Sequence, residues 1–241
     1  MRQGERNAIA MDMTIVIPQR GQIELTLDCL ASLRRVERNR WPVVVVDDGS
    51  TAEQQERFLR LKPAGVRLIV QSAAGVTAAW NRGVSHVCTT GVLFLNNDVL
   101  FHRPVMEQFV AALSSTQTYL AGVRLRRETL PLGATAESRH CQLLEGWAMA
   151  CRIEDYYRVG GFDEQFSLYY SDTDFQLRMR EEFGPSGLRL VDDLGLEHLG
   201  HRTAHRQPTQ RQFWQRDREL FRQKWERINH ERTEVKATAG L

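Results

Sequence analysis

The stretch "VVVVDDGST" at residues 43–51 decides the fold class, because a wholly apolar strand runs straight into a polar turn and a helix start. A run of valines without polar alternation is typical of a strand in a parallel sheet that is covered on both faces. Ser50 or Thr51 can cap the helix that follows. The stretch therefore predicts a strand–turn–helix unit that carries two carboxylates, Asp47 and Asp48, at the carboxyl end of its strand.

The alternation of strand and helix continues along the first half of the chain. The expected strands are 14–17, 43–46, 66–70 and 92–95, and the expected helices include 24–33 and 78–87. Elements at this spacing form βαβ units, which predicts an α/β fold with a mostly parallel central sheet flanked by helices. Residues 114–145 are mixed and loop-rich. The later expected elements are a strand at 120–125, a helix at 172–183 and a strand at 188–191.

The stretch "LFLNNDV" at residues 93–99 ends a buried strand with two amides and a carboxylate, Asn96, Asn97 and Asp98. Ligands of open α/β sheets collect at the carboxyl ends of the strands, so these side chains can hold a ligand. An Asx-type turn that terminates the strand explains the same residues equally well. This stretch alone leaves both interpretations open.

Carboxylates and imidazoles recur where strands end or helices begin. They are Asp47 and Asp48, Asp98, Asp172 and Asp174, and the late group His198, His201 and His205. Each cluster alone has an ordinary structural explanation, such as turn formation or interaction with a helix dipole. Together, the first two clusters are expected at one edge of one sheet, where carboxylate and imidazole ligands suit Mg²⁺ or Mn²⁺. A cation held by only one or two protein groups usually bridges substrate phosphates, which indicates a nucleoside diphosphate substrate.

The composition narrows the class of protein. The chain has 241 residues, 42% of them apolar, which is enough for a substantial core. A formal net charge of +2 does not indicate a nucleic-acid partner. Four cysteines without CxxC spacing argue against zinc or a disulfide framework and agree with a reducing cytosol. Neither a signal-peptide core nor an apolar stretch of about 18 residues is present, so we expect a cytoplasmic protein whose membrane contact is at most peripheral, at the inner face.

Five stretches in order carry a family resemblance. They are "TIVIPQRGQIELTLDCLASL", "VVVVDDGST", "GVTAAWNRGV", "LFLNNDV" and "GGFDEQFSLYYSDTDFQLRMR", followed by the looser "LEHLGHRT". From about residue 14 to residue 203 the chain resembles the family 2 glycosyltransferases, which are inverting enzymes of the A-type nucleotide-sugar fold. It is most similar to the bacterial branch that includes rhamnosyltransferase-like enzymes.

The resemblance implies a single A-type domain that moves a hexosyl or deoxyhexosyl group from a nucleoside-diphosphate sugar to a hydroxyl acceptor, with inversion. The acceptor would be a polysaccharide, a glycan or a lipid-linked glycan, and the cofactor Mg²⁺ or Mn²⁺. The residues that match the donor site are Pro18, Arg20, Asp47, Asp48, Gly75, Asn81 and Asn97. Asp98 matches the last carboxylate of the metal motif, and His198 matches a late metal or phosphate contact. Asp172 matches the catalytic base.

Departures from the family pattern keep a second function class open. Asn96 stands where the metal motif usually has its first acid, so the protein offers less negative charge to a cation. The chain would then be a catalytically degenerate nucleotide-binding scaffold or a regulatory α/β domain. A receiver domain would normally place a lysine at a strand end near the acids, and none of the three lysines lies there. Asp174 is a fallback for the base, although helix capping or packing support explains it better.

Several other residues near the expected site have two interpretations. Arg124, Arg126 and Arg127 would face a diphosphate or form a solvated strand edge. Trp147 and the pair Tyr169–Tyr170 would stack on sugar rings or belong to the core.

The expected organisation is an N-terminal extension (1–12), a nucleotide-sugar-binding half (13–113), an acceptor-binding and catalytic half (114–206) and a helical tail (207–241). Pro208 can start the tail helix. An apolar stripe then follows, formed by Phe213, Leu220, Phe221, Trp225 and Ile228. The stripe would pack on its own domain, on a second copy in a homodimer, or on an anionic membrane. We expect packing on protein, with the arginine-rich face outward.

Overall fold

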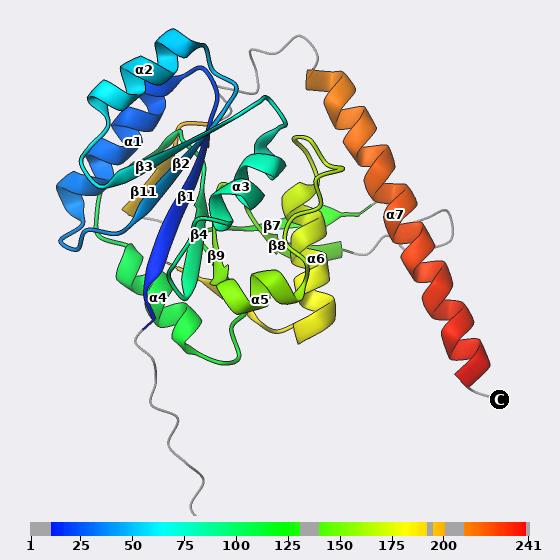
Figure 1. The fold of residues 1–241 in the computed structure, drawn as a ribbon. Coiled ribbons are helices and arrows are strands. Elements are labelled where there is room, and N and C mark those ends of the chain that lie inside the picture. Colours follow the sequence, from blue (N-terminus) through cyan, green and yellow to red (C-terminus); the bar gives the residue numbers. More distant parts are fainter. Residues whose placement is uncertain (1–10, 131–139, 192–194, 201–209, 240–241) are drawn as a thin grey trace, which may run out of the picture.

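The computed structural model describes residues 11–130, 140–191, 195–200 and 210–239 (Figure 1). The strands are β1 (Met13–Gln19), β2 (Val43–Asp48), β3 (Val66–Gln71), β4 (Gly91–Leu95), β5 (Val99–Phe101), β6 (Leu120–Gly122), β7 (Leu125–Thr129), β8 (His140–Leu144), β9 (Ala148–Arg152), β10 (Leu188–Leu190) and β11 (Leu196–His198). The helices are α1 (Ile23–Val36), α2 (Ala52–Leu61), α3 (Val76–Val84), α4 (Met106–Ser114), α5 (Ile153–Arg158), α6 (Ser171–Phe183) and α7 (Gln210–Ala239). The Pro208, His201 and His205 positions of the sequence analysis lie outside the described residues.

A seven-stranded sheet in the order β10-β6-β9-β4-β1-β2-β3 forms the centre of the fold. Neighbouring strands are parallel except at β9, which runs antiparallel to both β4 and β6. The predicted α/β fold with a mostly parallel sheet is therefore confirmed. Strands from both halves of the chain enter this one sheet, so its hydrogen bonds join the halves.

Helices cover both faces of the sheet, because each central strand is apolar on both sides (Figure 1). Ile15 and Ile17 of β1 pack with α1, α2 and α4, whereas Val16 faces α3, α5 and α6. The other strands divide in the same way, which buries two apolar layers around the sheet. This rigid sandwich fixes the position of every strand end.

The strand–turn–helix unit predicted from residues 43–51 is present. Of the two candidate caps, the structure uses Thr51: its hydroxyl accepts from the backbone N–H of Gln54, and the Gln54 side chain accepts from the Thr51 N–H. Ser50 instead accepts a hydrogen bond from the backbone N–H of Gly21 at the end of β1 (2.9 Å). The turn after β2 is thereby tied to the turn after β1.

The predicted elements of the first half are present with shifted ends, and the second half holds strands that we did not predict. Helix α3 starts at Val76, because Gly75 adopts a positive φ of 99° before it. The strand expected at 120–125 is split into β6 and the start of β7. Strand β9, "AMACR", lies in the middle of the sheet but has few residues of high β-propensity, so its pairing partners determine its conformation.

Helix α7 packs on its own domain (Figure 1). Phe221 and Trp225 are buried in one apolar cluster with Leu143, Phe166 and Leu177. The stripe predicted for the tail therefore packs on protein. None of the helices in the described ranges is long and apolar enough to cross a membrane.

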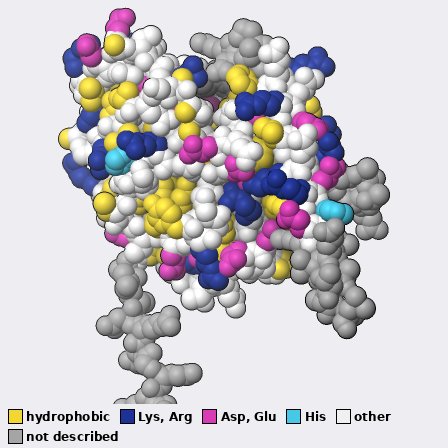
Figure 2. Space-filling view, turned by 45° about the vertical axis from the view of Figure 1, so that its right-hand side comes forward, with side chains coloured by type: hydrophobic (Ala, Val, Ile, Leu, Met, Phe, Trp, Pro, Cys, Tyr) yellow, Lys and Arg dark blue, Asp and Glu magenta, His cyan; other side chains and the backbone are white. Residues whose placement is uncertain are grey.

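The outer face of α7 carries paired charges. Arg222 forms ion pairs with Glu219 and Glu226 at 2.6 Å each. Figure 2 shows basic and acidic side chains interspersed over the face that it presents. These pairs are exposed or half-buried and contribute little stability, so the apolar cluster holds the helix in place.

We expect Phe221→Ala to lower the free energy of unfolding by about 3–5 kcal/mol, because it removes a fully buried aromatic ring from this cluster. Urea unfolding followed by circular dichroism measures the change. Gln223→Ala, an exposed position two residues along the same helix, is the matched control and should change stability by less than about 0.5 kcal/mol.

Truncation after residue 206 tests the same docking more severely. It should leave Phe166 and Leu177 exposed and lower the unfolding temperature. A truncated chain that keeps its stability and its oligomeric state, and loses only binding to anionic vesicles, would show that the stripe serves a membrane instead.

Candidate active site

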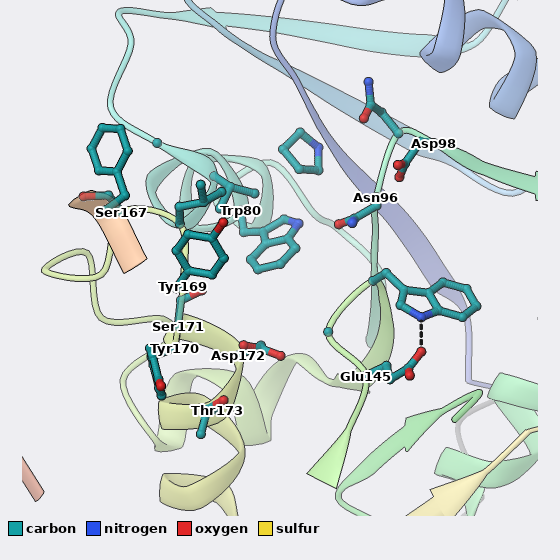
Figure 3. A pocket seen from close by; sticks show the side chains of 18 of the residues that line it. Trp80, Asn96, Asp98, Glu145, Ser167, Tyr169, Tyr170, Ser171, Asp172 and Thr173 are labelled. Atoms are coloured by element: carbon teal, nitrogen blue, oxygen red, sulfur yellow. Dashed lines mark hydrogen bonds between the residues drawn. The ribbon is translucent and has the colours of Figure 1, made fainter. Parts of the chain in front are cut away.

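A cavity of about 940 Å³ opens at the carboxyl edge of the central sheet (Figure 3). One wall comes from the turns after β1, β2 and β4, and the opposite wall from the hairpin β7–β8, the segment before α6 and the first turn of α7. Eight of the expected site residues line it: Pro18, Arg20, Asp48, Gly75, Asn97, Asp98, Asp172 and His198. Asp47 and Asn81 do not.

The two carboxylates after β2 have different surroundings. Asp47 is fully buried and accepts from Gln19 Nε2 (2.8 Å), the Ser50 N–H (2.8 Å) and Gln55 Nε2 (3.2 Å), so it builds the turn. Asp48 faces the cavity. Its placement is fixed by the next segment of chain.

The last residue of β3 and the segment after it hold Asp48. Its Oδ1 accepts from the Ala74 N–H at 2.7 Å and from Gln71 Nε2 at 2.8 Å, and its Oδ2 accepts from the Gly75 N–H at 2.9 Å. Because the carboxylate is clamped from three directions, it presents a fixed acceptor at the cavity wall.

Gly75 is confined on its other side as well. A side chain at Gly75 would lie 2.7 Å from the Ser167 carbonyl, so only glycine allows this approach.

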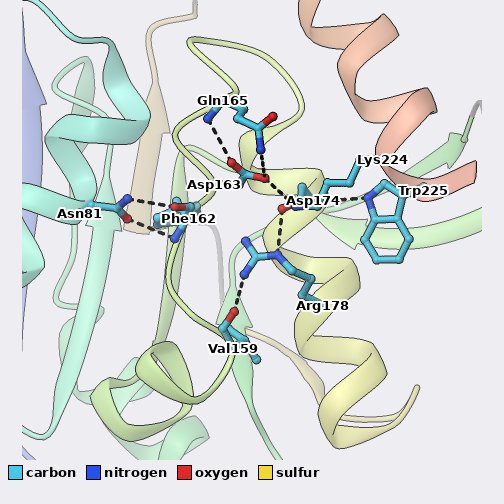
Figure 4. Close-up of polar contacts among 9 residues, drawn as sticks. All are labelled: Asn81, Val159, Phe162, Asp163, Gln165, Asp174, Arg178, Lys224 and Trp225. Carbon is cyan, nitrogen blue, oxygen red and sulfur yellow. Dashed lines mark hydrogen bonds and ion pairs between the residues drawn. The ribbon is translucent and has the colours of Figure 1, made fainter. Parts of the chain in front are cut away.

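Asn81 and Asn97 make structural contacts. The Asn81 amide donates to the Phe162 carbonyl (2.9 Å), and its oxygen accepts from the Phe162 N–H (3.1 Å) (Figure 4). The amide also donates to Glu164 (2.8 Å), and the oxygen also accepts from the Tyr156 hydroxyl. It therefore ties α3 to the segment before α6. Asn97 lines the cavity but donates its amide N–H to Thr26 of α1 at 3.1 Å. The sequence marks the positions of both residues but not the direction of their side chains.

Asp98 and His198 come together from distant parts of the chain. Strands β5 and β11 pair antiparallel, with Val99 opposite His198. His198 Nε2 consequently lies 3.2 Å from Asp98 Oδ1 and 3.5 Å from Asn96 Nδ2. The His198 ring is stacked on the Trp147 indole with 5.0 Å between ring centroids, which fixes its plane.

This pair fits a cation that is shared with substrate phosphates. Among the described residues, no three His, Cys, Asp or Glu side chains converge closely enough to enclose a metal ion by themselves. A carboxylate and an imidazole in contact, with an amide beside them, can supply two or three ligands. Mg²⁺ and Mn²⁺ at phosphate sites commonly take the remaining ligands from water and substrate.

Asp172 occupies the opposite wall, in the first turn of α6. Its Oδ2 forms an ion pair with Arg126 Nη1 at 2.9 Å, and Arg126 also donates to the Thr173 hydroxyl at 2.7 Å. Gly146 lies directly against the Asp172 carboxyl, where a larger residue would displace it. The guanidinium and the hairpin thus fix the direction of the carboxylate.

Arg126 is the centre of a small charge network. Its Nε lies 3.2 Å from Glu128 Oε2. Burial alone lowers the pKa of Arg126, but Asp172 and Glu128 outweigh burial and raise that pKa above its ordinary value. Burial raises the pKa of Glu128, Asp172 raises it further, and Arg126 only partly opposes them. Arg126 therefore stays positively charged beside Asp172.

Asp174 does not line the cavity and is fully buried, and Figure 4 shows its polar contacts. It pairs with Arg178 (2.8 Å) and Lys224 (2.8 Å) and accepts from the Trp225 indole N–H (3.1 Å). These contacts dock α7 onto α6, which is the packing support considered above for this residue.

The structure adds cavity residues whose roles the sequence left open or did not suggest. All three arginines, Arg124, Arg126 and Arg127, line the cavity, as do Glu145, Trp147, Tyr169 and Tyr170. Phe213 and Trp214, from the first turns of α7, complete the wall. The apolar stripe signalled Phe213, whereas nothing in the linear pattern signalled its contact with a distant cavity.

Residues 14–180 match the family model described as glycosyl transferase family 2. This chain belongs to glycosyl transferase family 2. The matched region contains every expected site residue except His198.

Solved structures share the fold of this glycosyltransferase at low sequence identity. A mannosyltransferase from Pyrobaculum calidifontis in complex with GDP-Man and Mn²⁺ is 18% identical, with a TM-score of 0.59 over 81% of this chain and 61% of that one. GalNAc-T7 with UDP, GalNAc and Mn²⁺ is 13% identical (TM-score 0.62; 78% and 43%). TarS of S. aureus is 15% identical (TM-score 0.57; 76% and 35%).

The glycosyltransferase covers less than two thirds of each of these chains. No curated protein matches it. These likenesses establish the A-type fold and nothing finer about the substrate.

Proposed function

We propose that this family 2 enzyme transfers a sugar with inversion from a nucleoside-diphosphate sugar to a hydroxyl of a carbohydrate acceptor, assisted by Mg²⁺ or Mn²⁺. The observation that carries the proposal is that Asp48, the Asp98–His198 pair and Asp172 all open onto one cavity. In this proposal, one donor molecule in the cavity would reach a group that binds its nucleotide, a pair that holds a cation and a carboxylate that accepts a proton.

The sheet edge binds the nucleotide in this proposal. Asp48, already clamped by backbone N–H groups, accepts hydrogen bonds from the base or ribose, and Pro18 and Arg20 border the same pocket. Asp98 and His198 would hold the cation, which would neutralise charge on the leaving diphosphate. Arg124 and Arg127 add positive charge at the opposite wall. Two of the solved neighbours are Mn²⁺ complexes, which supports the choice of metal.

Asp172 is the base. The acceptor hydroxyl passes its proton to the Asp172 carboxylate as its oxygen attacks the anomeric carbon and the bond to the diphosphate breaks. Arg126 already contacts Oδ2, so we assign the proton to Oδ1. A single displacement with one base inverts the anomeric centre.

Aromatic side chains suggest where the acceptor binds. Trp214 lines the cavity and remains 42% exposed, in a protein whose other cavity tryptophans are buried. Phe213 and Tyr169 line the same wall. An exposed indole offers an apolar face to the C–H surface of a pyranose ring, which favours a glycan acceptor.

The finer expectations remain hypotheses. These are a deoxyhexosyl donor of the rhamnosyltransferase-like kind, a lipid-linked acceptor, a homodimer, and a cytoplasmic location with peripheral contact at the inner membrane face. The division of the chain at residues 12, 113 and 206 is likewise a working scheme. A non-catalytic nucleotide-binding scaffold is the second candidate function, favoured by the amide of Asn96 beside the proposed metal ligands.

A donor panel distinguishes the two functions. Thermal shift with Mn²⁺ and GDP-mannose, UDP-N-acetylgalactosamine and a deoxythymidine-diphosphate deoxyhexose identifies the donor. Release of nucleoside diphosphate from that donor, with and without glycan acceptors, reports turnover. Binding without turnover under every condition would favour the scaffold.

We expect Asp98→Ala to abolish the binding of UDP and GDP that depends on Mg²⁺ or Mn²⁺, because the cation then loses its carboxylate ligand. Calorimetry with and without a chelator measures this. Asp28→Ala, at an exposed position of α1, is the control and should bind normally. The metal assignment would be wrong if UDP and GDP bound to the Asp98→Ala protein, or to the wild type with chelator, as tightly as they bind to the wild type with metal.

We expect Asp172→Asn to lower kcat by about 10²–10⁴, the usual contribution of a general base, while the fold and donor affinity stay unchanged. Steady-state kinetics with the donor from the panel measures the loss. Asp174→Asn is the comparison variant. An inactive Asp174→Asn protein beside a near-normal Asp172→Asn protein would move the role two residues along.

We expect Trp214→Ala to raise the KM for a glycan acceptor by about fivefold to tenfold with little change in the donor KM, since one stacking contact contributes about 1–1.5 kcal/mol. Trp214→Phe should recover part of the loss. An unchanged acceptor KM would remove α7 from the acceptor site.

A further inference from the structure

A short segment, residues 167–170, lies between the cavity and the part of α7 around Asp217. We call it the strap. All four of its residues line the cavity. It ends at Tyr170, which adopts the left-handed conformation with φ 62° and precedes α6 directly. Among the described non-glycine residues, no other has a positive φ. Such a conformation costs about 1–3 kcal/mol and persists only where surrounding contacts enforce it.

One carboxylate of α7 holds the strap. Asp217 is fully buried, and its Oδ2 accepts from the backbone N–H groups of Leu168 (3.0 Å) and Tyr169 (2.9 Å). Hydrogen bonds from backbone N–H groups to an ionised acceptor are stronger than neutral ones. Asp217 lies four residues before Phe221, so it belongs to the buried face of the helix and not to its charged outer face.

The contacts around this carboxylate extend its effect to both ends of the strap. Arg216 donates to the Ser167 hydroxyl at 3.1 Å. The Tyr170 ring packs on Phe221 with 5.0 Å between centroids, and the Tyr170 carbonyl accepts the Asp174 N–H at 2.8 Å. The unusual residue is therefore held between α7 on one side and the first turn of α6 on the other.

The strap also reaches the two functional walls of the cavity. At the start of the strap, the Ser167 carbonyl lies directly against Gly75, whose N–H donates to Asp48. At its end, Tyr170 stands two residues before Asp172 and sets the direction in which α6 begins. A shift of the strap would therefore change the position of the Asp172 carboxylate relative to Asp48.

We propose that Asp217 is a positioning residue: by binding two backbone N–H groups of the strap, it holds Tyr170 in its left-handed conformation and thereby aims Asp172 at the acceptor hydroxyl. The proposal rests on the proposed function of Asp172. It makes α7 part of the catalytic apparatus and not only a structural cover. Asp217 itself touches no reacting atom.

The test compares Asp217→Ala with Asp217→Asn. Asparagine keeps an oxygen at the Oδ2 position for both N–H groups. The other oxygen, Oδ1, is buried without a hydrogen-bond partner in the described part of the chain, so an amide nitrogen there breaks no existing bond. Glu219→Ala is the matched control. Glu219 lies two residues along α7 and forms an ion pair with Arg222 on the outer face of the helix. If the Asp217→Ala protein fails to fold, Asp217→Glu takes its place. Glutamate keeps the charge but moves the carboxylate by one methylene away from its position in the wild type.

Three measurements are made on the full-length proteins. Amide hydrogen exchange reports protection of residues 168 and 169. Calorimetry with UDP and GDP in Mn²⁺ reports nucleotide affinity. Release of UDP from UDP-N-acetylgalactosamine and of GDP from GDP-mannose, with water as acceptor, reports turnover.

In the Asp217→Ala protein we expect faster exchange at residues 168 and 169, a kcat lowered by about tenfold to hundredfold, and nucleotide affinity within about threefold of the wild type, because a small misplacement of a catalytic group has effects of this size. Asp217→Asn and Glu219→Ala should stay near the wild type.

A wild-type kcat in Asp217→Ala or Asp217→Glu, or wild-type exchange at residues 168 and 169, overturns the proposal. So does an Asp217→Asn protein as slow as Asp217→Ala, since the buried charge would then matter instead of the hydrogen bonds. A wild-type enzyme that hydrolyses neither donor counts against the proposed function. The hydrogen-exchange result still tests whether Asp217 holds the strap.

Discussion

A carboxylate can be buried in this protein only where hydrogen-bond donors or cations meet it, and this constraint organises the whole site. Asp47 and Asp48 follow one strand, yet the first collects donors within its own turn and the second collects them from the segment after β3. Asp174 is met by arginine, lysine and indole donors. Each carboxylate thus draws a different piece of chain toward the sheet edge, and the cavity is the space that these pieces enclose.

The first half of the fold follows from local pattern alone. The valines of 43–46 and the apolar run of 92–95 are buried on both faces. Their side chains need no hydrogen-bond partner there, and the strand ladder pairs their backbone groups. The second half depends on long-range pairing. Strand β9 holds alanine, methionine and cysteine, and it becomes a strand because β4 and β6 flank it with free edges. No periodicity in five residues could have indicated that.

The candidate site also combines residues that local motifs predict with contacts that depend on long-range pairing. Asp48, Asp98 and Asp172 could be placed from motifs, because each follows or begins an element that the pattern marks. The contacts that orient these side chains could not be predicted from the sequence. Arg126 reaches Asp172 across the β7–β8 hairpin, and His198 reaches Asp98 because β11 pairs with β5 some hundred residues away. Side-chain direction, as for Asn81 and Asn97, is decided by partners that only the folded chain brings close.

The order of segments along the chain has a consequence for the timing of assembly. The central sheet, Asp48 and Asp172 all precede α7 in the sequence, and a ribosome delivers a chain from its first residue to its last. While α7 is still inside the ribosomal tunnel, the N–H groups of Leu168 and Tyr169 have no carboxylate to bind, and the apolar patch around Phe166 is uncovered. A nascent chain can therefore fold its sheet before α7 orders the segment of residues 167–170.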